Sequence, residues 1–259
     1  QGIEGVAQEN LADAYADSVK AAIDAFEQEG IGVAGILICP DFANEGLVNL
    51  PVGYMEKAIG HVRGAGGLFI ADEVQGGFGR TGHQWWSHEA EGVIPDIVTL
   101  GKPMGNGHPL AAVIAREDLL DQFGEWSMYF NTFGGNPVSC AVGMAVLDVL
   151  EEEQLLDNAI QVGGFVADGL RELQSRYDII GDVRDKGMFF AMELVADRES
   201  KAPATEASGR FINMMYEQGV LISRIGRHDN ILKLRPPMPF ARDNAVQLLE
   251  TLDQCFAAL

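Results

Sequence analysis

A lysine and an aspartate stand at the ends of two successive apolar runs of this sequence. Asp72 follows the run Leu68–Ala71, and Lys102 follows the run Ile94–Gly101. Ligands of open α/β sheets gather at the carboxyl ends of the strands, so both side chains are expected to face one site. A lysine against an apolar wall can lose its proton and become a nucleophile, and an aspartate can pair with a cationic ring nitrogen. Pyridoxal phosphate needs both groups, an amine for its Schiff base and a carboxylate for its pyridinium nitrogen.

The elements that must position these two residues alternate between helix and strand. Apolar residues at helical spacing predict helices over residues 10–29 and 51–65. Continuous apolar runs predict buried strands over residues 33–38, 68–71 and 97–100. Such alternation is typical of a mostly parallel sheet with right-handed crossovers.

The pattern changes in the second half of the chain. Two long apolar helices are predicted over residues 137–152 and 158–177. They are followed by strands at 183–195, 221–223 and 231–234 and by helices at 204–218 and 242–258. We therefore predict that residues 1–152 form part of a large α/β domain, whose mainly parallel sheet is incomplete here, and that residues 153–259 form a small C-terminal α+β domain.

Longer motifs around the two strand-end residues resemble those of a known family. Ile70–Gly82 is similar to the aspartate signature of the class III (subgroup II, ω-type) aminotransferases, and Pro95–Lys102 is similar to their lysine signature. Pro103–Pro109 and Tyr129–Cys140 resemble the narrower branch of alanine–glyoxylate aminotransferase 2-like proteins and the ethanolamine-phosphate and phosphohydroxylysine phospho-lyases. The resemblance covers nearly the whole chain and implies a fold-type I pyridoxal-phosphate-dependent transferase.

The resemblance implies that four residues hold the cofactor, pyridoxal 5'-phosphate. Lys102 would bind it as a Schiff base, and Asp72 would keep its ring nitrogen protonated. Val74 would pack on one face of the ring, and Gln75 would donate to its 3-oxygen. A solvated surface lysine and a helix-capping aspartate are the plainer alternatives.

Two further residues are assigned by the resemblance. Thr132 would reach the cofactor phosphate of a neighbouring subunit, which requires a homodimer, and a turn-forming threonine is the alternative. Arg235 would bind the carboxylate of the substrate, and a salt bridge within the small domain is the alternative. The remaining candidates for anionic groups are Arg80, His83, Arg227 and His228.

One loop supports a rival class of protein. Gly77–Gly82 matches the pattern G-x-G-x-x-G of dinucleotide-binding dehydrogenases. Several residues separate this loop from the strand before it, and no helix opens after Gly82. The only acid near the distance that the motif requires, Asp96, precedes a strand instead of following one. We therefore favour the aminotransferase family. A third hypothesis, a non-catalytic interaction domain, keeps the fold without the activity.

Two features limit what the resemblance implies. Many family members have a glutamate where this chain has Cys39, and a cysteine cannot neutralise the charge of Arg235, so the substrate is left open. The family also carries an N-terminal stretch that supplies a glycine/serine loop for the cofactor phosphate and an aromatic ring that stacks on the cofactor. Neither is found in this sequence, so we expect the chain alone to carry half an active site.

Composition narrows the choice of partners. The 259 residues carry a net charge of −20, which disfavours nucleic acid and anionic membranes. No apolar run is long enough to span a bilayer and no secretory signal precedes the first helix, so a cytoplasmic location is predicted. The histidines and the three cysteines show no metal-ligand spacing, so no metal site is predicted.

The predicted function is transfer of an amino group from a primary (ω- or α-) amine to a keto acid such as pyruvate or glyoxylate. The alternative is a phospho-lyase that eliminates phosphate and ammonia from a phosphorylated amino alcohol. Both reactions begin when Lys102 removes a proton from the carbon that bears nitrogen, and both use Asp72, so these residues do not choose between them.

Overall fold

The computed structural model describes residues 2, 3 and 5–259, and these form two compact units. Unit 1 comprises the described residues of Gln1–Pro40 together with Asn49–Phe78 and Trp86–Leu147, and unit 2 comprises Asp41–Val48, Gly79–Trp85 and Asp148–Leu259. Each unit has a sheet of its own. The division into domains at residue 152 stays a prediction of the sequence.

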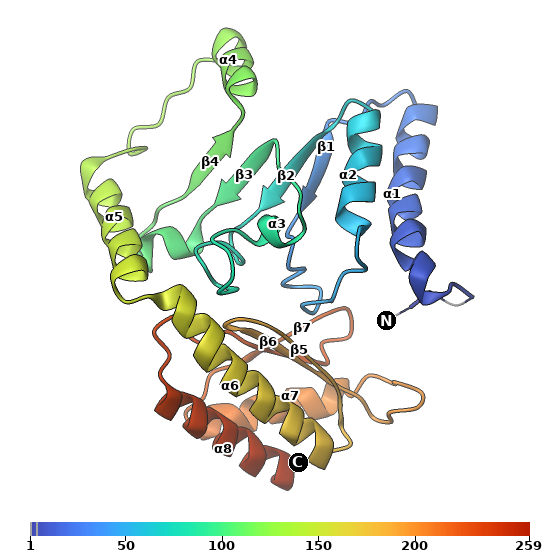
Figure 1. Cartoon of the computed structure of the whole chain (residues 1–259), viewed down its shortest axis with the longest axis vertical. Helices are drawn as coiled ribbons and strands as arrows, with labels where there is room; N and C mark the ends of the chain where they lie inside the picture. The colour runs from blue at the N-terminus through green and yellow to red at the C-terminus, as the bar shows by residue number, and fades with distance from the viewer. Residues whose placement is uncertain (1, 4) are drawn as a thin grey trace. The chain divides into compact units, whose positions relative to one another are not determined.

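The sheet of unit 1 has four strands in the order of the sequence (Figure 1). They are β1 (Gly35–Ile38), β2 (Leu68–Asp72), β3 (Ile97–Leu100) and β4 (Ala112–Ala115). β1, β2 and β3 run parallel, and β4 pairs antiparallel with β3. The mainly parallel sheet confirms the predicted fold class, whereas β4 and the helix that follows it, α4 (Glu117–Trp126), were not predicted.

Two helices of unit 1, α1 (Leu11–Gln28) and α2 (Tyr54–Gly64), pack against each other, and α2 also contacts β1 and β2. The buried side chains of α2 are three to four residues apart, so they share one face: Met55, Ala58, Ile59 and Val62. The remaining elements of this half of the chain are η1 (Gln8–Asn10), α3 (Ser87–Ala90), η2 (Lys102–Gly105) and α5 (Pro137–Glu152).

Asp96, a buried carboxylate directly before β3, links β2, α2 and the residue that follows β4. Its Oδ2 accepts hydrogen bonds from the Phe69 amide (2.8 Å) and from Arg63 (3.1 Å), and its Oδ1 accepts one from Arg116 (2.5 Å). Burial alone would raise the pKa of the Asp96 carboxyl, but these hydrogen bonds outweigh burial and hold the pKa below its ordinary value. Protein donors occupy both oxygens, which argues against Asp96 as the ribose ligand of a dinucleotide site.

Unit 2 is built on an antiparallel sheet in the order β5 (Ile180–Lys186), β6 (Phe189–Leu194), β8 (Ile231–Leu234) and β7 (Ser223–Ile225). Three helices share one apolar core with this sheet: α6 (Leu155–Arg176), α7 (Thr205–Glu217) and α8 (Arg242–Ala258) (Figure 1). Phe190 and Leu232 enter the core from the sheet, and Leu170, Phe211 and Phe256 enter it from the helices.

The strand predicted over residues 183–195 is wrong in its extent. The structure has two antiparallel strands there, β5 and β6, and Lys186 pairs with Phe189 across a turn at Gly187 and Met188. Gly187 has a φ of +57°, which a residue with a side chain rarely adopts. A single glycine separates the charged end of β5 from the apolar residues of β6, and this was too weak a turn signal to divide the predicted strand.

Candidate active site

The ends of β2 and β3 place Asp72 and Lys102 at one edge of the unit 1 sheet. Asp72 is the last residue of β2 and is in register with Thr99 of β3, and the Glu73 amide donates to the Thr99 carbonyl (3.1 Å). β3 ends at Leu100, and after one glycine Lys102 begins η2. Because the two strands are parallel, both residues leave the sheet at its carboxyl edge, where ligands of such sheets bind.

The carboxylate of Asp72 is held by a hydrogen bond from the residue two positions further along the chain, and this bond uses one of its two oxygens. Its Oδ1 accepts a hydrogen bond from the Val74 amide (3.0 Å), which fixes the side chain in a tight turn. The described residues give Oδ2 no hydrogen bond. A half-buried carboxylate with one open oxygen fits a protonated ring nitrogen, so the residues present suit the cofactor that the sequence predicts.

Val74, which follows Asp72 in the next turn, packs beside Gly101, which directly precedes Lys102. A Cβ atom placed on Gly101 would lie 3.6 Å from Cγ2 of Val74, so the Val74 side chain packs beside the segment that leads into Lys102. Gln75 follows and is half-buried. The side chain of Lys102 is exposed, so the described residues do not supply the apolar wall that sequence reasoning expected around the amine.

A hydrogen-bond network missed by sequence reasoning joins the loop after Lys102 to the start of α5. His108 lies 2.8 Å from the hydroxyl of Ser139, and the Asn136 side-chain amide donates to the same hydroxyl (2.9 Å). The Asn136 oxygen accepts from the Ser139 amide (3.0 Å). His108, Asn136 and Ser139 lie within the two motifs that resemble the narrower branch of the family. The sequence therefore singled out these segments, but the spacing of the three residues did not predict a contact between them.

Thr132 lies in the exposed loop between α4 and α5. The described residues give its side chain no hydrogen bond. Large apolar side chains surround it in sequence and are exposed to 91% at Met128, 80% at Phe130 and 78% at Phe133. The structure thus places Asp72 and Lys102 at the same edge of the sheet, and the described residues give Thr132 no hydrogen bond to either of them.

Glu73, next to the candidate aspartate, is fully buried and holds the start of α3. Its carboxylate accepts hydrogen bonds from the amide and hydroxyl of Ser87 (2.9 and 2.8 Å) and from the amide of His88 (2.8 Å), and it lies 2.7 Å from Nδ1 of His88. Burial alone would raise the pKa of the Glu73 carboxyl, but the hydrogen bonds from His88 and Ser87 outweigh it and lower the pKa. Glu73 is therefore structural.

We expect Glu73→Gln to destabilise the protein by about 2–3 kcal/mol at neutral pH, the usual effect of losing hydrogen bonds to a charged group. The lowered pKa means that the ionised carboxylate stabilises the fold above the ordinary glutamate pKa of about 4.3 and that this stabilisation disappears as the pH falls. Denaturant unfolding at several pH values measures the difference. A gap between wild type and variant that stays constant down to about pH 3 would contradict this account.

The glycines that match the dinucleotide pattern are used for packing within the protein. A Cβ atom on Gly77 would lie 2.8 Å from the Glu73 carbonyl oxygen, and one on Gly82 would lie 2.7 Å from Cγ1 of Ile160 in α6. The next helix, α3, begins only at Ser87. The loop is therefore not the strand-to-helix turn that binds a pyrophosphate, and this argues against the rival class.

Gly82→Ala is expected to destabilise the protein by about 2–4 kcal/mol, from left-handed backbone strain and overpacking together. Gly82 has a φ of +83°, and the added methyl would also lie 3.1 Å from the Ile160 backbone nitrogen, which cannot move aside cheaply. Gly219→Ala is the matched control, because Gly219 has a φ of +80° and open space around it. Equal losses of thermal stability in the two variants would show that contact with α6 is unimportant.

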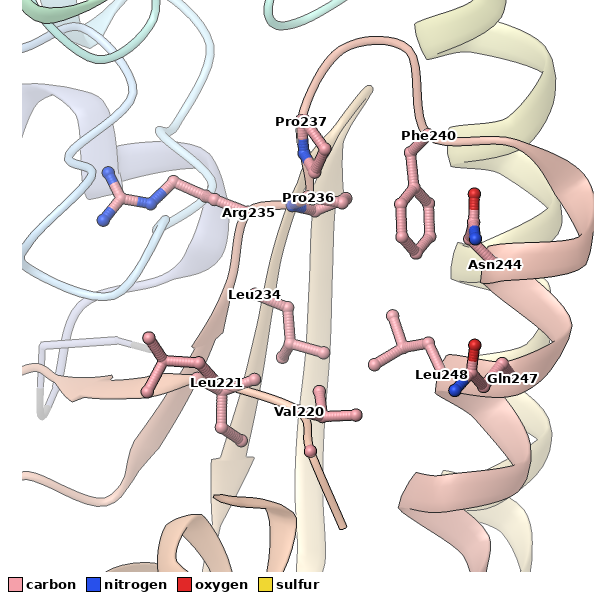
Figure 2. Close-up of a pocket in the computed structure, with 12 residues that line it drawn as sticks. Val220, Leu221, Leu234, Arg235, Pro236, Pro237, Phe240, Asn244, Gln247 and Leu248 are labelled. Carbon is pink, nitrogen blue, oxygen red and sulfur yellow. The ribbon is translucent and has the colours of Figure 1, made fainter. Parts of the chain in front are cut away.

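Arg235 follows β8 in unit 2 and is exposed. Its guanidinium carbon lies 5.1 Å from the centre of the Phe189 ring, a cation–π contact. A cavity of about 310 Å³ lies beside it and is lined mainly by apolar side chains, among them Val220 and Phe240. Figure 2 shows the Arg235 guanidinium extending away from Phe240 and Asn244, so the charge does not point into this cavity.

Four other residues were candidates for binding an anionic group of the substrate, and one of them, Arg80, lies next to Arg235. Arg80 donates to the carbonyl oxygen of Pro236, the residue after Arg235 (2.5 Å). Arg227 and His228 lie in the turn between β7 and β8, at the opposite end of the four-residue strand β8 from Arg235. His83 is exposed in the loop of unit 2 that also carries Arg80.

Within the described residues, no group of three potential ligands is arranged to hold a metal ion. The helices of the described part of the chain are too short or too polar to cross a membrane.

Comparison with known proteins identifies the family of the chain. The chain matches the family Aminotransferase class-III over residues 4–256. It is 40% identical over 243 residues to ethanolamine-phosphate phospho-lyase homolog 1 of Caenorhabditis elegans, covering 93% of this chain and 52% of the relative. The fold superposes with a TM-score of 0.95 on a phospholyase from Arthrobacter in complex with phosphoethanolamine, at 44% identity over 100% of this chain and 62% of that one. A Bacillus anthracis aminotransferase superposes with a TM-score of 0.87 at 29% identity, covering 94% of this chain and 56% of that one.

The chain therefore belongs to the class III aminotransferases. This confirms the family and the branch that the sequence motifs indicated, the fold-type I α/β fold, and pyridoxal 5'-phosphate as the cofactor. The chain spans about half the length of the curated relatives that it matches.

Proposed function

We propose that the protein is an aminotransferase that holds pyridoxal 5'-phosphate at the edge of the sheet where β2 and β3 end. The observation that supports it is the placement of Asp72 and Lys102 at two adjacent parallel strand ends, in a chain of this family. When bound, the cofactor supplies an electron-withdrawing ring to the substrate carbon that bears nitrogen.

Each residue of this edge has a task in the proposed reaction. The Lys102 amine would hold the cofactor covalently and, once freed by the amine of the substrate, would remove the proton from the carbon that bears nitrogen. The open oxygen of Asp72 keeps the ring nitrogen protonated. Val74 would pack on one face of the ring, and Gln75 would donate to its 3-oxygen. The amino group of a primary amine passes to a keto acid such as pyruvate or glyoxylate, and Arg235 binds the anionic group of the substrate.

A homodimer is part of this proposal. The exposed loop that carries Thr132 also carries Met128, Phe130 and Phe133, and apolar patches of this kind are usually covered by a partner. A second copy of the chain would cover them and would receive Thr132 as a donor to its cofactor phosphate. Sedimentation of the full-length holoenzyme should give a dimer, and a fully active monomer would refute the shared site. The cytoplasmic location and the absence of nucleic acid and membrane partners stay predictions of the sequence.

Phosphate elimination is the second candidate function. It is supported by the higher identity to the Arthrobacter phospholyase (44%) than to the Bacillus anthracis aminotransferase (29%). The same Lys102 and Asp72 would act in it, because loss of a phosphate from the neighbouring carbon follows the same removal of a proton.

An amine-donor screen of the full-length holoenzyme without keto acid separates the two functions. An aminotransferase should convert its cofactor once to the amine form and then stall until pyruvate or glyoxylate is added. Sustained release of ammonia and inorganic phosphate from a phosphorylated amino alcohol would overturn the aminotransferase proposal and establish the second candidate.

A further inference from the structure

Lys102 depends on its backbone for its position. Its side chain is exposed and makes no hydrogen bond to the described residues. The residue begins η2, a single 3-10 turn of four residues, and such short turns are marginally stable on their own. The direction in which the amine leaves the sheet is therefore set by the contacts that hold η2 and the loop after it.

Backbone hydrogen bonds within this segment are local. Three amides each donate to the carbonyl of the residue three positions earlier, at 2.8, 3.2 and 2.9 Å: Met104, Asn106 and His108. These bonds close three linked turns, and the chain passes through positive φ at Asn106 (+43°) and Gly107 (+105°). They do not tie the segment to another element, so its position depends on side chains.

Helix α5 supports this segment at two places. Nε2 of His108 lies 2.8 Å from the hydroxyl of Ser139, in the first turn of α5. One turn further, a Cβ atom on Gly143 would lie 2.8 Å from Cδ2 of Leu110 and 3.8 Å from the carbonyl oxygen of Met104. Positions 139 and 143 share one face of the helix, and all of these residues lie in unit 1, so the support belongs to one compact body.

Asn136 orients the hydroxyl that faces His108. Asn136 precedes α5, and its side-chain oxygen accepts from the Ser139 amide (3.0 Å), the usual bond of a residue that caps a helix N-terminus. Its side-chain amide donates to the Ser139 hydroxyl oxygen (2.9 Å). The hydroxyl then gives its own proton to Nε2 of His108, the only acceptor that the described residues offer it. Ser139 is buried, so water does not readily replace a lost partner.

We propose that His108 is a positioning residue: its hydrogen bond to Ser139 holds residues 102–110 against α5 and thereby fixes where the Lys102 amine stands at the edge of the sheet. The inference rests on the proposed function, in which this amine holds the cofactor and moves the proton. A group misplaced by about 1 Å can cost about a hundredfold in rate. Because His108 acts through Lys102, its loss lowers kcat and leaves KM nearly unchanged.

The kinetic test compares full-length wild-type, His108→Ala, Ser139→Ala and double-variant holoenzymes, with His61→Ala as the matched control. His61 is half-buried in α2, as His108 is in its loop, and the described residues give its side chain no hydrogen bond. We expect each single variant to lower kcat about tenfold to a hundredfold and to change KM about threefold or less. The double variant should lose no more than the worse single variant, because the two side chains share one interaction.

Hydrogen exchange provides a second readout that does not depend on turnover. The amides at positions 104, 106 and 108 should exchange about tenfold faster in the His108→Ala and Ser139→Ala enzymes, the effect of losing one hydrogen bond that holds the segment. The amides of α2 should be unaffected. Unchanged exchange, unchanged kcat, or an equal effect of His61→Ala would overturn the positioning role.

A conservative variant and the labelling of Lys102 keep the possible failures apart. If the alanine variants do not fold, His108→Gln decides the matter, because an amide of this length can still bond the Ser139 hydroxyl. It should keep kcat within about threefold of wild type, and a hundredfold loss with normal exchange would contradict the proposal. Borohydride label on a lysine other than Lys102 would refute the proposed function, and the exchange rates would still decide whether His108 holds the segment.

Discussion

Replacing Lys102 by alanine is expected to lower turnover of the full-length holoenzyme by about a thousandfold or more, because the chain loses its nucleophile and its general base at once. The fold should survive this change. The Lys102 side chain is exposed and makes no hydrogen bond to the described residues, so its removal breaks no contact that stabilises unit 1. Steady-state kinetics with the best amine donor measure the loss, and thermal unfolding measures stability.

Lys20→Ala is the matched control for this experiment. Lys20 is an exposed lysine of α1 that pairs with Asp24, and exposed pairs of this kind contribute little to stability. It should leave both activity and stability nearly unchanged. A Lys102→Ala enzyme with turnover similar to the Lys20→Ala enzyme would exclude Lys102 from the chemistry.

Asp72→Asn is expected to lower turnover by about a hundredfold to a thousandfold with little change in the fold. The asparagine oxygen can still accept the hydrogen bond from the Val74 amide, so the turn is kept. The negative charge opposite the ring nitrogen is lost, and removing one partner of a desolvated charge pair costs about 3–4 kcal/mol, which corresponds to this range of rates.

Asp118→Asn is the control for the aspartate variant. Asp118 is an exposed carboxylate paired with Arg116 near the start of α4, outside the candidate site. It should leave turnover unchanged. If Asp72→Asn lowers thermal stability as much as turnover, Asp72 is a structural residue and its assignment to the cofactor is wrong.

The parts of the fold that sequence could predict are those with strong local patterns. The helix expected over residues 242–258 and the strand expected over 231–234 coincide with α8 and β8, because regular apolar spacing fixed both. β4 was missed because Ala112–Ala115 offers only four small or branched residues, too short a run for a distinct pattern. The hairpin at Gly187 was missed because one glycine, with no proline, asparagine or second glycine beside it, separates its two strands.

The candidate site was predictable only where its residues end strands. Asp72 and Lys102 follow apolar runs, so topology alone placed them at one edge of the sheet. Other contacts join residues that no periodicity relates. Examples are the hydrogen bonds of Glu73 with Ser87 and His88 and the hydrogen bond between Arg80 and the Pro236 carbonyl. The exposure of Lys102 was also unpredictable, because an apolar strand before a lysine says nothing of what covers its amine.

The central claim is that Lys102 carries the cofactor, and borohydride reduction of the full-length holoenzyme followed by peptide mapping tests it most directly. Reduction makes the covalent bond between lysine and cofactor permanent, so the modified peptide reports the attachment site whatever the substrate is. We expect the label on the single peptide that contains Lys102, with none on the Lys102→Ala variant. Label on any other lysine, or an unlabelled protein that retains its activity, would contradict the account.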